Sequence, residues 1–284
     1  MQQIDAPSLL ASWHGACFVP TMGALHEGHG SLIRLASSTG RPTVVSIFVN
    51  PTQFGPGEDF DRYPRTLEAD LAIAKSCGAA ACWTPSVADL YPRGAEAARA
   101  EAEAMTLPAV ATAPGLEDRC RPGHFAGVAQ VVARLFDLLR PSAAVFGEKD
   151  FQQLRLIESM VEEDAASTSP RWPGLSIVRG ATIRESDGLA MSSRNRYLDA
   201  DSRERSRGLS RALQVAHAAQ HPETAERLMR ETLEHHGLEI EYAAVRDAET
   251  LMPVADLRRP TRALIAARLP MVRLIDNAAL VAWR

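Results

Sequence analysis

The chain has 284 residues, of which 46% are hydrophobic and 23% charged, with a formal net charge of −4 and a pI near 6.1. This composition is that of a globular protein with a sizeable core, and the length suits one large domain or two smaller ones. The slightly negative charge argues against a nucleic-acid-binding surface, although a locally positive pocket can still hold a small anion.

The sequence gives no sign of export or of membrane insertion. Residues 1–16 have no basic region followed by a long apolar stretch, so we predict no signal peptide, and no apolar run approaches the roughly 18 residues of a membrane span. The four cysteines, Cys17, Cys77, Cys82 and Cys120, form no C-x-x-C pair. Reduced thiols in a cytoplasmic protein are therefore expected.

Short apolar runs alternate with segments of helical period over the first 180 residues. Strands are predicted at 16–20, 43–50, 79–85, 142–147 and 175–180, and helices at 27–37, 64–78, 124–141 and 150–164. The segment 94–121 is interpreted as helical or irregular, and 165–174 as a loop. Such alternation predicts an α/β fold in which helices cover both faces of a parallel sheet.

The sequence pattern changes after about residue 182. Two charged amphipathic helices are predicted at 199–220 and 224–236, and three strands at 240–247, 262–270 and 272–283. We therefore predict a larger domain over 1–182 and a small α+β C-terminal domain over 183–284.

The segment “PTMGALHEGH” (20–29) follows the first predicted strand and leads into a helix. Gly23 permits a sharp turn, and a helix N-terminus attracts phosphate through its unpaired N–H groups. His26 and His29 are three apart, so they share a face near that anion site. A metal site is disfavoured because no further ligands cluster here. A structural histidine pair remains an alternative.

Other polar loops follow neighbouring strands, at the sheet edge where α/β proteins bind ligands. Lys149 in “GEKD” is placed to reach phosphates there, and Gln53 and Gln153 carry amides suited to a hydroxyl or a carboxylate. “MSSR” (191–194) offers two hydroxyls and a guanidinium, which bind phosphate well. The alternatives are a solvated lysine and a Ser-rich turn.

The acidic residues Glu58, Asp59 and Asp61 suggest a magnesium site at first sight. Magnesium usually keeps several waters and takes its other ligands from substrate phosphates. We therefore interpret the three carboxylates as a solvated loop face and predict no protein metal ligand.

“PTMGALHEGH” resembles the His-x-Gly-His signature of the nucleotidyltransferase superfamily. With “NPTQFGPGEDFDRYPRT”, “RPGHFAGV”, “FGEKDFQQL” and “GLAMSSRNRYL” in this order, residues 17–199 resemble the pantothenate synthetase (pantoate–β-alanine ligase) family, and residues 273–280 resemble it more loosely. The resemblance implies a Rossmann-like domain with a smaller C-terminal lid. It also implies an ATP-dependent, AMP-forming condensation of (R)-pantoate with β-alanine through pantoyl adenylate.

The same resemblance implies roles for individual residues. His29 would be a proton donor, with His26, Lys149 and Arg194 also catalytic, while Gln53 and Gln153 would bind pantoate and Gln53 also β-alanine. The implied ATP site comprises Met22, Gly23, His26, His29, Gly147, Lys149, Asp150, Ile183, Met191, Ser192, Ser193 and Arg194. Magnesium would bind through the ATP phosphates, and the protein would be a homodimer. Further candidates for substrate contact are Asn50, Tyr63, Arg121 and His124, although Asn50 before Pro51 also fits a turn.

Three rival functions remain at this point. They are a nucleotidyltransferase for another acceptor, a tRNA synthetase fragment and a non-catalytic nucleotide-binding paralogue. A dehydrogenase is disfavoured because no G-x-G-x-x-G follows the first strand. The sequence departs from the family pattern at three places, which puts the local loop shape in question. They are Gly30, the absence of a glycine after Glu117, and the long loop 165–174.

Overall fold

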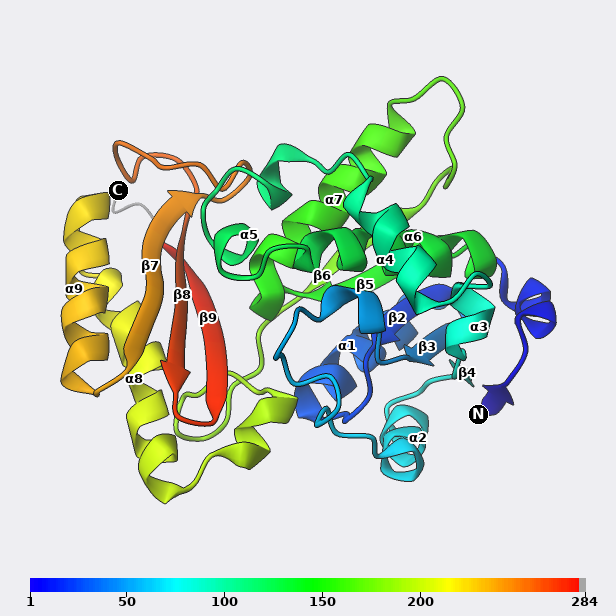
Figure 1. Ribbon diagram of the computed structural model, residues 1–284, viewed down its shortest axis with the longest axis horizontal. Helices are drawn as coiled ribbons and strands as arrows, with labels where there is room; N and C mark the ends of the chain where they lie inside the picture. Colours follow the sequence, from blue (N-terminus) through cyan, green and yellow to red (C-terminus); the bar gives the residue numbers. More distant parts are fainter. Residues whose placement is uncertain (281–284) are drawn as a thin grey trace.

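The computed structural model, which describes residues 1–280, contains a six-stranded parallel sheet in the first part of the chain (Figure 1). Its strands are β1 (Gln2–Ile4), β2 (Cys17–Thr21), β3 (Thr43–Ile47), β4 (Ala81–Trp83), β5 (Ala143–Gly147) and β6 (Ser176–Gly180). The order β1-β4-β3-β2-β5-β6 reverses between β2 and β5. That reversal is a topological switch point, and the predicted Rossmann-like fold is confirmed.

Helices cover both faces of this sheet. Helices α1 (Glu27–Ser37) and α2 (Leu67–Ser76) pack on one face, and α6 (His124–Leu139) and α7 (Phe151–Ala165) on the other. The strands alternate accordingly, since Val19 of β2 joins the α1–α2 cluster whereas Phe18 joins the α6–α7 cluster.

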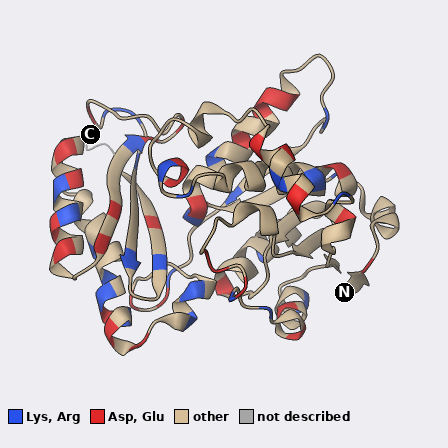
Figure 2. Ribbon diagram, viewed as in Figure 1, with Lys and Arg blue, Asp and Glu red and all other residues tan. Residues whose placement is uncertain are grey.

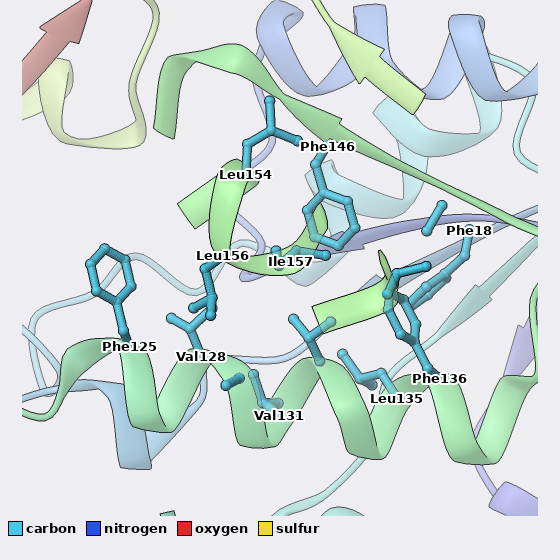
Figure 3. Packing of buried hydrophobic residues seen from close by; sticks show 14 of the residues in the cluster. Phe18, Phe125, Val128, Val131, Leu135, Phe136, Phe146, Leu154, Leu156 and Ile157 are labelled. Atoms are coloured by element: carbon cyan, nitrogen blue, oxygen red, sulfur yellow. The ribbon is translucent and has the colours of Figure 1, made fainter. Parts of the chain in front are cut away.

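Helix α6, in which most residues are buried, forms because apolar residues recur with helical period. Val128, Val131 and Leu135 point into the core, and the rings of Phe18 and Phe136 meet edge to face with centroids 6.4 Å apart (Figure 3). This packing fixes the position of the helix N-terminus at the sheet edge.

The C-terminal part contains the two helices and three strands that were predicted, and the strands form an antiparallel sheet. Its elements are α8 (Ala200–Ala216), α9 (Pro222–His235), β7 (Glu239–Asp247), β8 (Thr261–Leu269) and β9 (Val272–Leu280). The last predicted strand residues, 281–283, lie outside the described residues. Basic and acidic residues alternate along α9, as in the pair Arg227–Glu231 at 2.8 Å (Figure 2).

The C-terminal sheet is buried on both faces. Ala243 and Ile265 pack with α8 and α9, whereas Tyr242 and Leu264 belong to the apolar cluster that contains α6 and α7. Because apolar packing continues across residue 182, the predicted division into separate domains there stays a prediction.

Several local expectations are corrected by the structure. Strand β1 was not predicted, since three residues with one buried side chain, Ile4, give no detectable period. The predicted strand 43–50 ends at Ile47, because Asn50 caps a 3-10 turn over Pro51–Gln53. The interpretation of 94–121 as helical or irregular is confirmed, since this segment contains α4 (Ala95–Glu103), a 3-10 turn (Ala109–Ala111) and α5 (Glu117–Cys120). The short helix α3 (Val87–Leu90), which was not predicted, precedes it.

No helix within residues 1–280 combines the length and the apolar character needed to cross a membrane. All four cysteines are free thiols, three of them buried.

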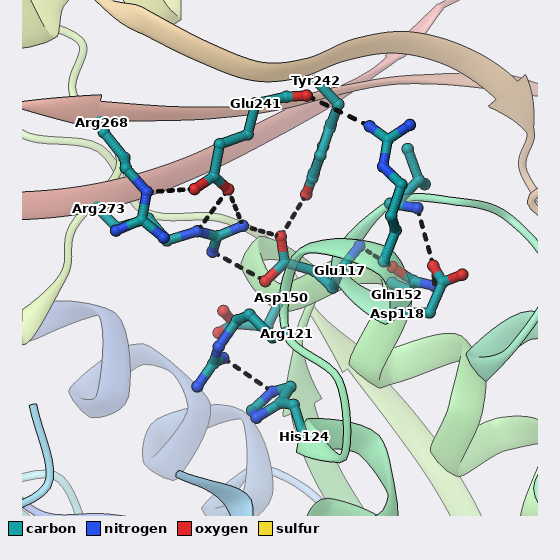
Figure 4. Close-up of polar contacts among 12 residues, drawn as sticks. Glu117, Asp118, Arg121, His124, Asp150, Gln152, Glu241, Tyr242, Arg268 and Arg273 are labelled. Atoms are coloured by element: carbon teal, nitrogen blue, oxygen red, sulfur yellow. Dashed lines mark hydrogen bonds and ion pairs between the residues drawn. The ribbon is translucent and has the colours of Figure 1, made fainter. Parts of the chain in front are cut away.

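A buried charge cluster joins the C-terminal sheet to the rest of the protein. Glu117 of α5 accepts hydrogen bonds from the Tyr242 hydroxyl at 2.7 Å and from Nη1 of Arg273 at 2.9 Å (Figure 4). Arg273 also pairs with Glu241 at 2.8 Å. Burial alone would raise the pKa of Glu117, but the bonds and charge of Arg273 offset burial and lower that pKa. The ionised carboxylate therefore fixes β7 and β9 against α5.

Replacing Glu117 by Ala would remove one of the two carboxylates that neutralise the largely buried Arg273. We expect the free energy of unfolding, measured with urea at pH 7, to fall by about 3–5 kcal/mol. Glu101→Ala is the matched control, since Glu101 pairs with the exposed Arg93 and its loss should cost less than about 1 kcal/mol. Equal losses in the two variants would contradict the anchoring role of Glu117.

Candidate active site

A cavity of about 230 Å³ opens where β2, β3 and β5 end, at the switch point of the sheet. The first residues of three helices contribute to its wall, namely those of α1, α6 and α7. Since helix N-termini carry partial positive charge, the cavity suits an anionic ligand. Two smaller hollows of about 40 and 50 Å³ adjoin it, between β9 and the segments that carry Arg121 and Lys149.

The predicted site residues come together in this cavity. Those that line it are Met22, His26, His29, Gln53, Gly147, Lys149, Asp150, Gln153, Ile183, Met191, Ser192, Ser193 and Arg194. The further candidates Asn50, Tyr63, Arg121 and His124 line it as well. Gly23 does not; it forms the turn behind the cavity at a φ of 83°.

The two histidines cap the start of α1 reciprocally. Nδ1 of His26 accepts the Gly28 N–H at 3.2 Å, and Nδ1 of His29 accepts the His26 N–H at 3.3 Å. This arrangement is a capping box built from imidazoles. It brings the ring centroids to 4.1 Å and turns both rings to the cavity.

Burial keeps both rings neutral, and the cap determines which ring nitrogen carries the proton. Burial, followed by the charge of Lys149, lowers the pKa of His26 to about 4, and burial, followed by His26, lowers the pKa of His29 to about 3. Each ring is therefore neutral at pH 7. Because Nδ1 accepts a hydrogen bond, the proton resides on Nε2, at the opposite edge of the ring. The pair thus offers two neutral N–H donors.

The turn that delivers these histidines depends on Asp70, which sequence reasoning missed. The Asp70 carboxylate is buried in α2 and accepts the N–H groups of Ala24 at 3.0 Å and Leu25 at 2.7 Å. It thereby stabilises Gly23 and Ala24 at positive φ. The sequence did contain a signal for a buried role of Asp70. This acidic residue lies four positions before Ala74, on the apolar face of the helix.

Gln53 is held in place by a buried amide. Asn50 donates to Oε1 of Gln53 at 3.1 Å and to the Gly127 carbonyl at 3.1 Å, and its own Oδ1 accepts from Tyr91 at 2.8 Å. Gly127 is required here, because a Cβ would lie 2.5 Å from the Thr52 backbone. Asn50 therefore organises the turn, in agreement with its alternative interpretation as a turn residue.

His124 and Arg121 organise the neighbouring loop. His124 Nδ1 lies 2.9 Å from the Gln53 carbonyl, which can only accept, so Nδ1 carries the proton and Nε2 accepts from Arg121 at 3.0 Å (Figure 4). Burial, followed by Arg121, lowers the pKa of His124 to about 4. Arg121 also binds Glu58 at 2.6 Å.

The “MSSR” segment is attached to the same loop. Arg194 binds Asp59 through two hydrogen bonds of 2.7 and 2.9 Å, and the Ser193 hydroxyl lies 3.3 Å from that of Tyr63. Burial alone would raise the pKa of Asp59, but the bonds to Arg194 more than offset it and lower that pKa. The expectation of a solvated loop face is therefore wrong for Glu58 and Asp59, because arginines partly bury them; Asp61 is exposed.

The remaining predicted residues line the cavity from the β5 end and from the connection to the C-terminal part. Lys149 lies in the 3-10 turn Glu148–Asp150, with its ammonium 3.5 Å from Asp150. Met191 donates its N–H to the Ile183 carbonyl at 2.9 Å, which closes a short hairpin. Within residues 1–280, no three histidine, cysteine or acidic side chains are grouped to hold a metal ion.

The free energy of unfolding should depend on pH through His26 and His29. Their pKa values are below the ordinary 6.5, so the unfolded chain binds protons first and the free energy of unfolding should fall as pH drops from 7 to 4.5. In the double variant His26→Asn, His29→Gln, both replacements can cap but neither titrates. Urea unfolding should show a smaller loss for this variant. Parallel pH profiles for the variant and the wild type would contradict the assignment.

The chain is similar to known proteins over nearly its whole length. The family model described as pantoate-beta-alanine ligase matches residues 4–279. A pantothenate synthetase of Magnetococcus marinus is 48% identical over 269 residues, covering 93% of this chain and 88% of the relative. The crystal structure of pantothenate synthetase from Thermus thermophilus matches with a TM-score of 0.87 at 38% identity, covering 98% and 99% of the two chains.

A second solved structure is the pantoate-beta-alanine ligase of Francisella tularensis, complexed with beta-gamma ATP and beta-alanine. It matches with a TM-score of 0.76 at 30% identity, covering 98% of this chain and 97% of that one. Fold, length and sequence agree in these comparisons, and the chain belongs to the pantoate–β-alanine ligase (pantothenate synthetase) family, whose reaction condenses pantoate with β-alanine.

Proposed function

We propose that this cavity carries out the family reaction in two steps, through pantoyl adenylate. A carboxylate oxygen of pantoate attacks the α-phosphorus of ATP, and the bond to the β-phosphate breaks to release pyrophosphate. The amine of β-alanine then attacks the acyl carbon, loses a proton and displaces AMP. The observation that carries the proposal is the pair of neutral imidazoles at the switch point, in the same cavity as Lys149 and Arg194.

In the first step, charge accumulates on the phosphate oxygens, and fixed donors stabilise it. Nε2–H of His26 and of His29 would donate to these oxygens without prior reorganisation, since the helix cap holds both rings. Bound triphosphate raises a histidine pKa. His29 would therefore act as a proton donor only once ATP is present, and as a neutral hydrogen-bond donor before that.

The cations of the cavity would exchange partners when ATP binds. Lys149 and Arg194 pair with Asp150 and Asp59 in the structure, and a triphosphate competes for the same N–H groups. Ser192 and Ser193 add hydroxyl donors beside Arg194. On the family resemblance, Met22, Gly23, Gly147, Asp150, Ile183 and Met191 complete the nucleotide site.

Pantoate would lie against Gln53 and Gln153, which present neutral amides to its hydroxyl and carboxylate. Gln153 is on the first turn of α7, and Gln53 is oriented by Asn50. Gln53 ends the 3-10 turn that follows β3, and this position also suits a contact with β-alanine. Arg121 and His124 would act indirectly, by holding the Gln53 turn and the Glu58 loop.

Magnesium would enter bound to the ATP phosphates, which supply the oxygen ligands that this ion prefers. The family resemblance supports a homodimer, for which light scattering should give about twice the chain mass of 30.8 kDa. Four free thiols agree with a reducing compartment such as the cytoplasm.

The function is tested by isotope exchange between pyrophosphate and ATP. With magnesium present, exchange should require pantoate and should not require β-alanine, because the adenylate forms before the amine reacts. Chelation of the metal should abolish it. Exchange without pantoate, or only with a different acid, would contradict the proposed substrate.

The role of His29 is tested by His29→Gln, which keeps the cap of α1. Exchange should slow by about 10²–10³-fold, the usual effect of removing a preorganised donor to a developing oxyanion. Transfer from added pantoyl adenylate to β-alanine should change far less. Leu269→Ala, in the core of the C-terminal sheet, controls for general destabilisation. Equal slowing of both half-reactions by His29→Gln would contradict a role confined to phosphate chemistry.

A further inference from the structure

Asn277 connects the C-terminal sheet directly to the lysine of the cavity. It lies in β9, is 3% exposed, and lines the hollow of about 40 Å³ that Lys149 also lines. Its Nδ2 donates to two successive carbonyl oxygens, that of Glu148 at 3.0 Å and that of Lys149 at 2.8 Å. One amide group thus holds both peptide units of the turn that carries Lys149.

Arg262 of β8 fixes the orientation of this amide. Its Nε donates to Oδ1 of Asn277 at 2.7 Å, so the amide NH₂ must face the two carbonyls. Arg262 is itself 7% exposed, stacks over the Phe151 ring at 4.0 Å and lies 3.2 Å from the Glu148 carboxylate. The amide therefore has one arrangement that satisfies all its neighbours.

We propose that Asn277 is a positioning residue for the reaction, which acts on the phosphates only through Lys149. The inference rests on the proposed function for the role of Lys149 as a phosphate-binding cation. The Lys149 backbone is fixed by β9, so its ammonium starts from a defined point at the end of β5. A displacement of about 1 Å in a catalytic group can cost about 100-fold in rate.

The alternative is that Asn277 only stabilises the C-terminal sheet. Its neighbour Asp276 has a different partner, because its carboxylate accepts from Arg184, in the hairpin between Ile183 and Met191, at 2.7 and 2.9 Å. The two possibilities differ in which half-reaction is affected and in whether the effect requires the Lys149 side chain.

Asn277→Asp separates them. The replacement has the same shape and still accepts from Arg262, but it loses both donors to the turn and opposes two carbonyl oxygens with a carboxylate. Pantoate-dependent pyrophosphate exchange should fall by about 10–100-fold, while transfer from added pantoyl adenylate to β-alanine changes less than threefold. Asn277→Ala, which also lacks the donors, should behave in the same way if the aspartate variant does not fold. The stability control is Leu269→Ala, which should lower the melting temperature and keep exchange.

A double-mutant cycle with Lys149→Ala shows whether Asn277 acts through Lys149. In the Lys149→Ala background, Asn277→Asp should lower the residual exchange by less than about twofold. Losses that multiply, or wild-type exchange in both Asn277 variants, would overturn the proposal while leaving the proposed function intact.

The crystal structures of the ligand-free wild type and of Asn277→Asp give a readout that does not depend on activity. The Glu148–Lys149 peptide groups should be displaced in the variant. Coincident positions of these peptide groups would overturn the proposal about Asn277. The absence of pantoate-dependent exchange in the wild type would instead contradict the proposed function, so the two failures can be distinguished.

Discussion

The reciprocal cap at the start of α1 is the interaction on which the site depends. Two backbone N–H groups that a helix leaves unpaired are satisfied by Nδ1 of His26 and Nδ1 of His29. The same bonds place the proton of each neutral ring on Nε2 and turn both rings to the cavity. A single local arrangement therefore sets helix geometry, tautomer and hydrogen-bonding character together. Asp70 supports it from α2 by holding the preceding turn.

The charges around the cavity are arranged so that each cation has a carboxylate partner. Lys149 faces Asp150, Arg121 binds Glu58, and Arg194 binds Asp59. Without substrate, each of these three partly buried cations is therefore compensated, and an uncompensated one would be costly. An anionic nucleotide can replace these partners one by one. The ion pairs also attach the loop after β3 to the segments on both sides of the cavity, which links nucleotide binding to the position of the Gln53 turn.

Much of this could be predicted from the sequence, because the informative signals are local. Alternating strands and helices indicated the parallel sheet, and polar residues at the ends of β2 and β5 indicated the site. The contributions of Asp70 and Asn277 depend on contacts across 46 and 128 residues, which no local pattern contains. Glu58 and Asp59 were misinterpreted for the same reason, since their arginine partners lie 63 and 135 residues away.

The C-terminal sheet is part of the construction of the site. Glu117, Arg273 and Tyr242 anchor it, and Asn277 of β9 donates hydrogen bonds to the turn that carries Lys149.

The most direct test of the central claim, that the cap of α1 presents two neutral Nε2–H donors, is ¹⁵N NMR of the histidine rings in the ligand-free protein at pH 7. We expect neutral rings protonated at Nε2 for His26 and His29, in contrast to Nδ1–H for His124. Cationic rings, or Nδ1–H in either of the first two, would contradict the account.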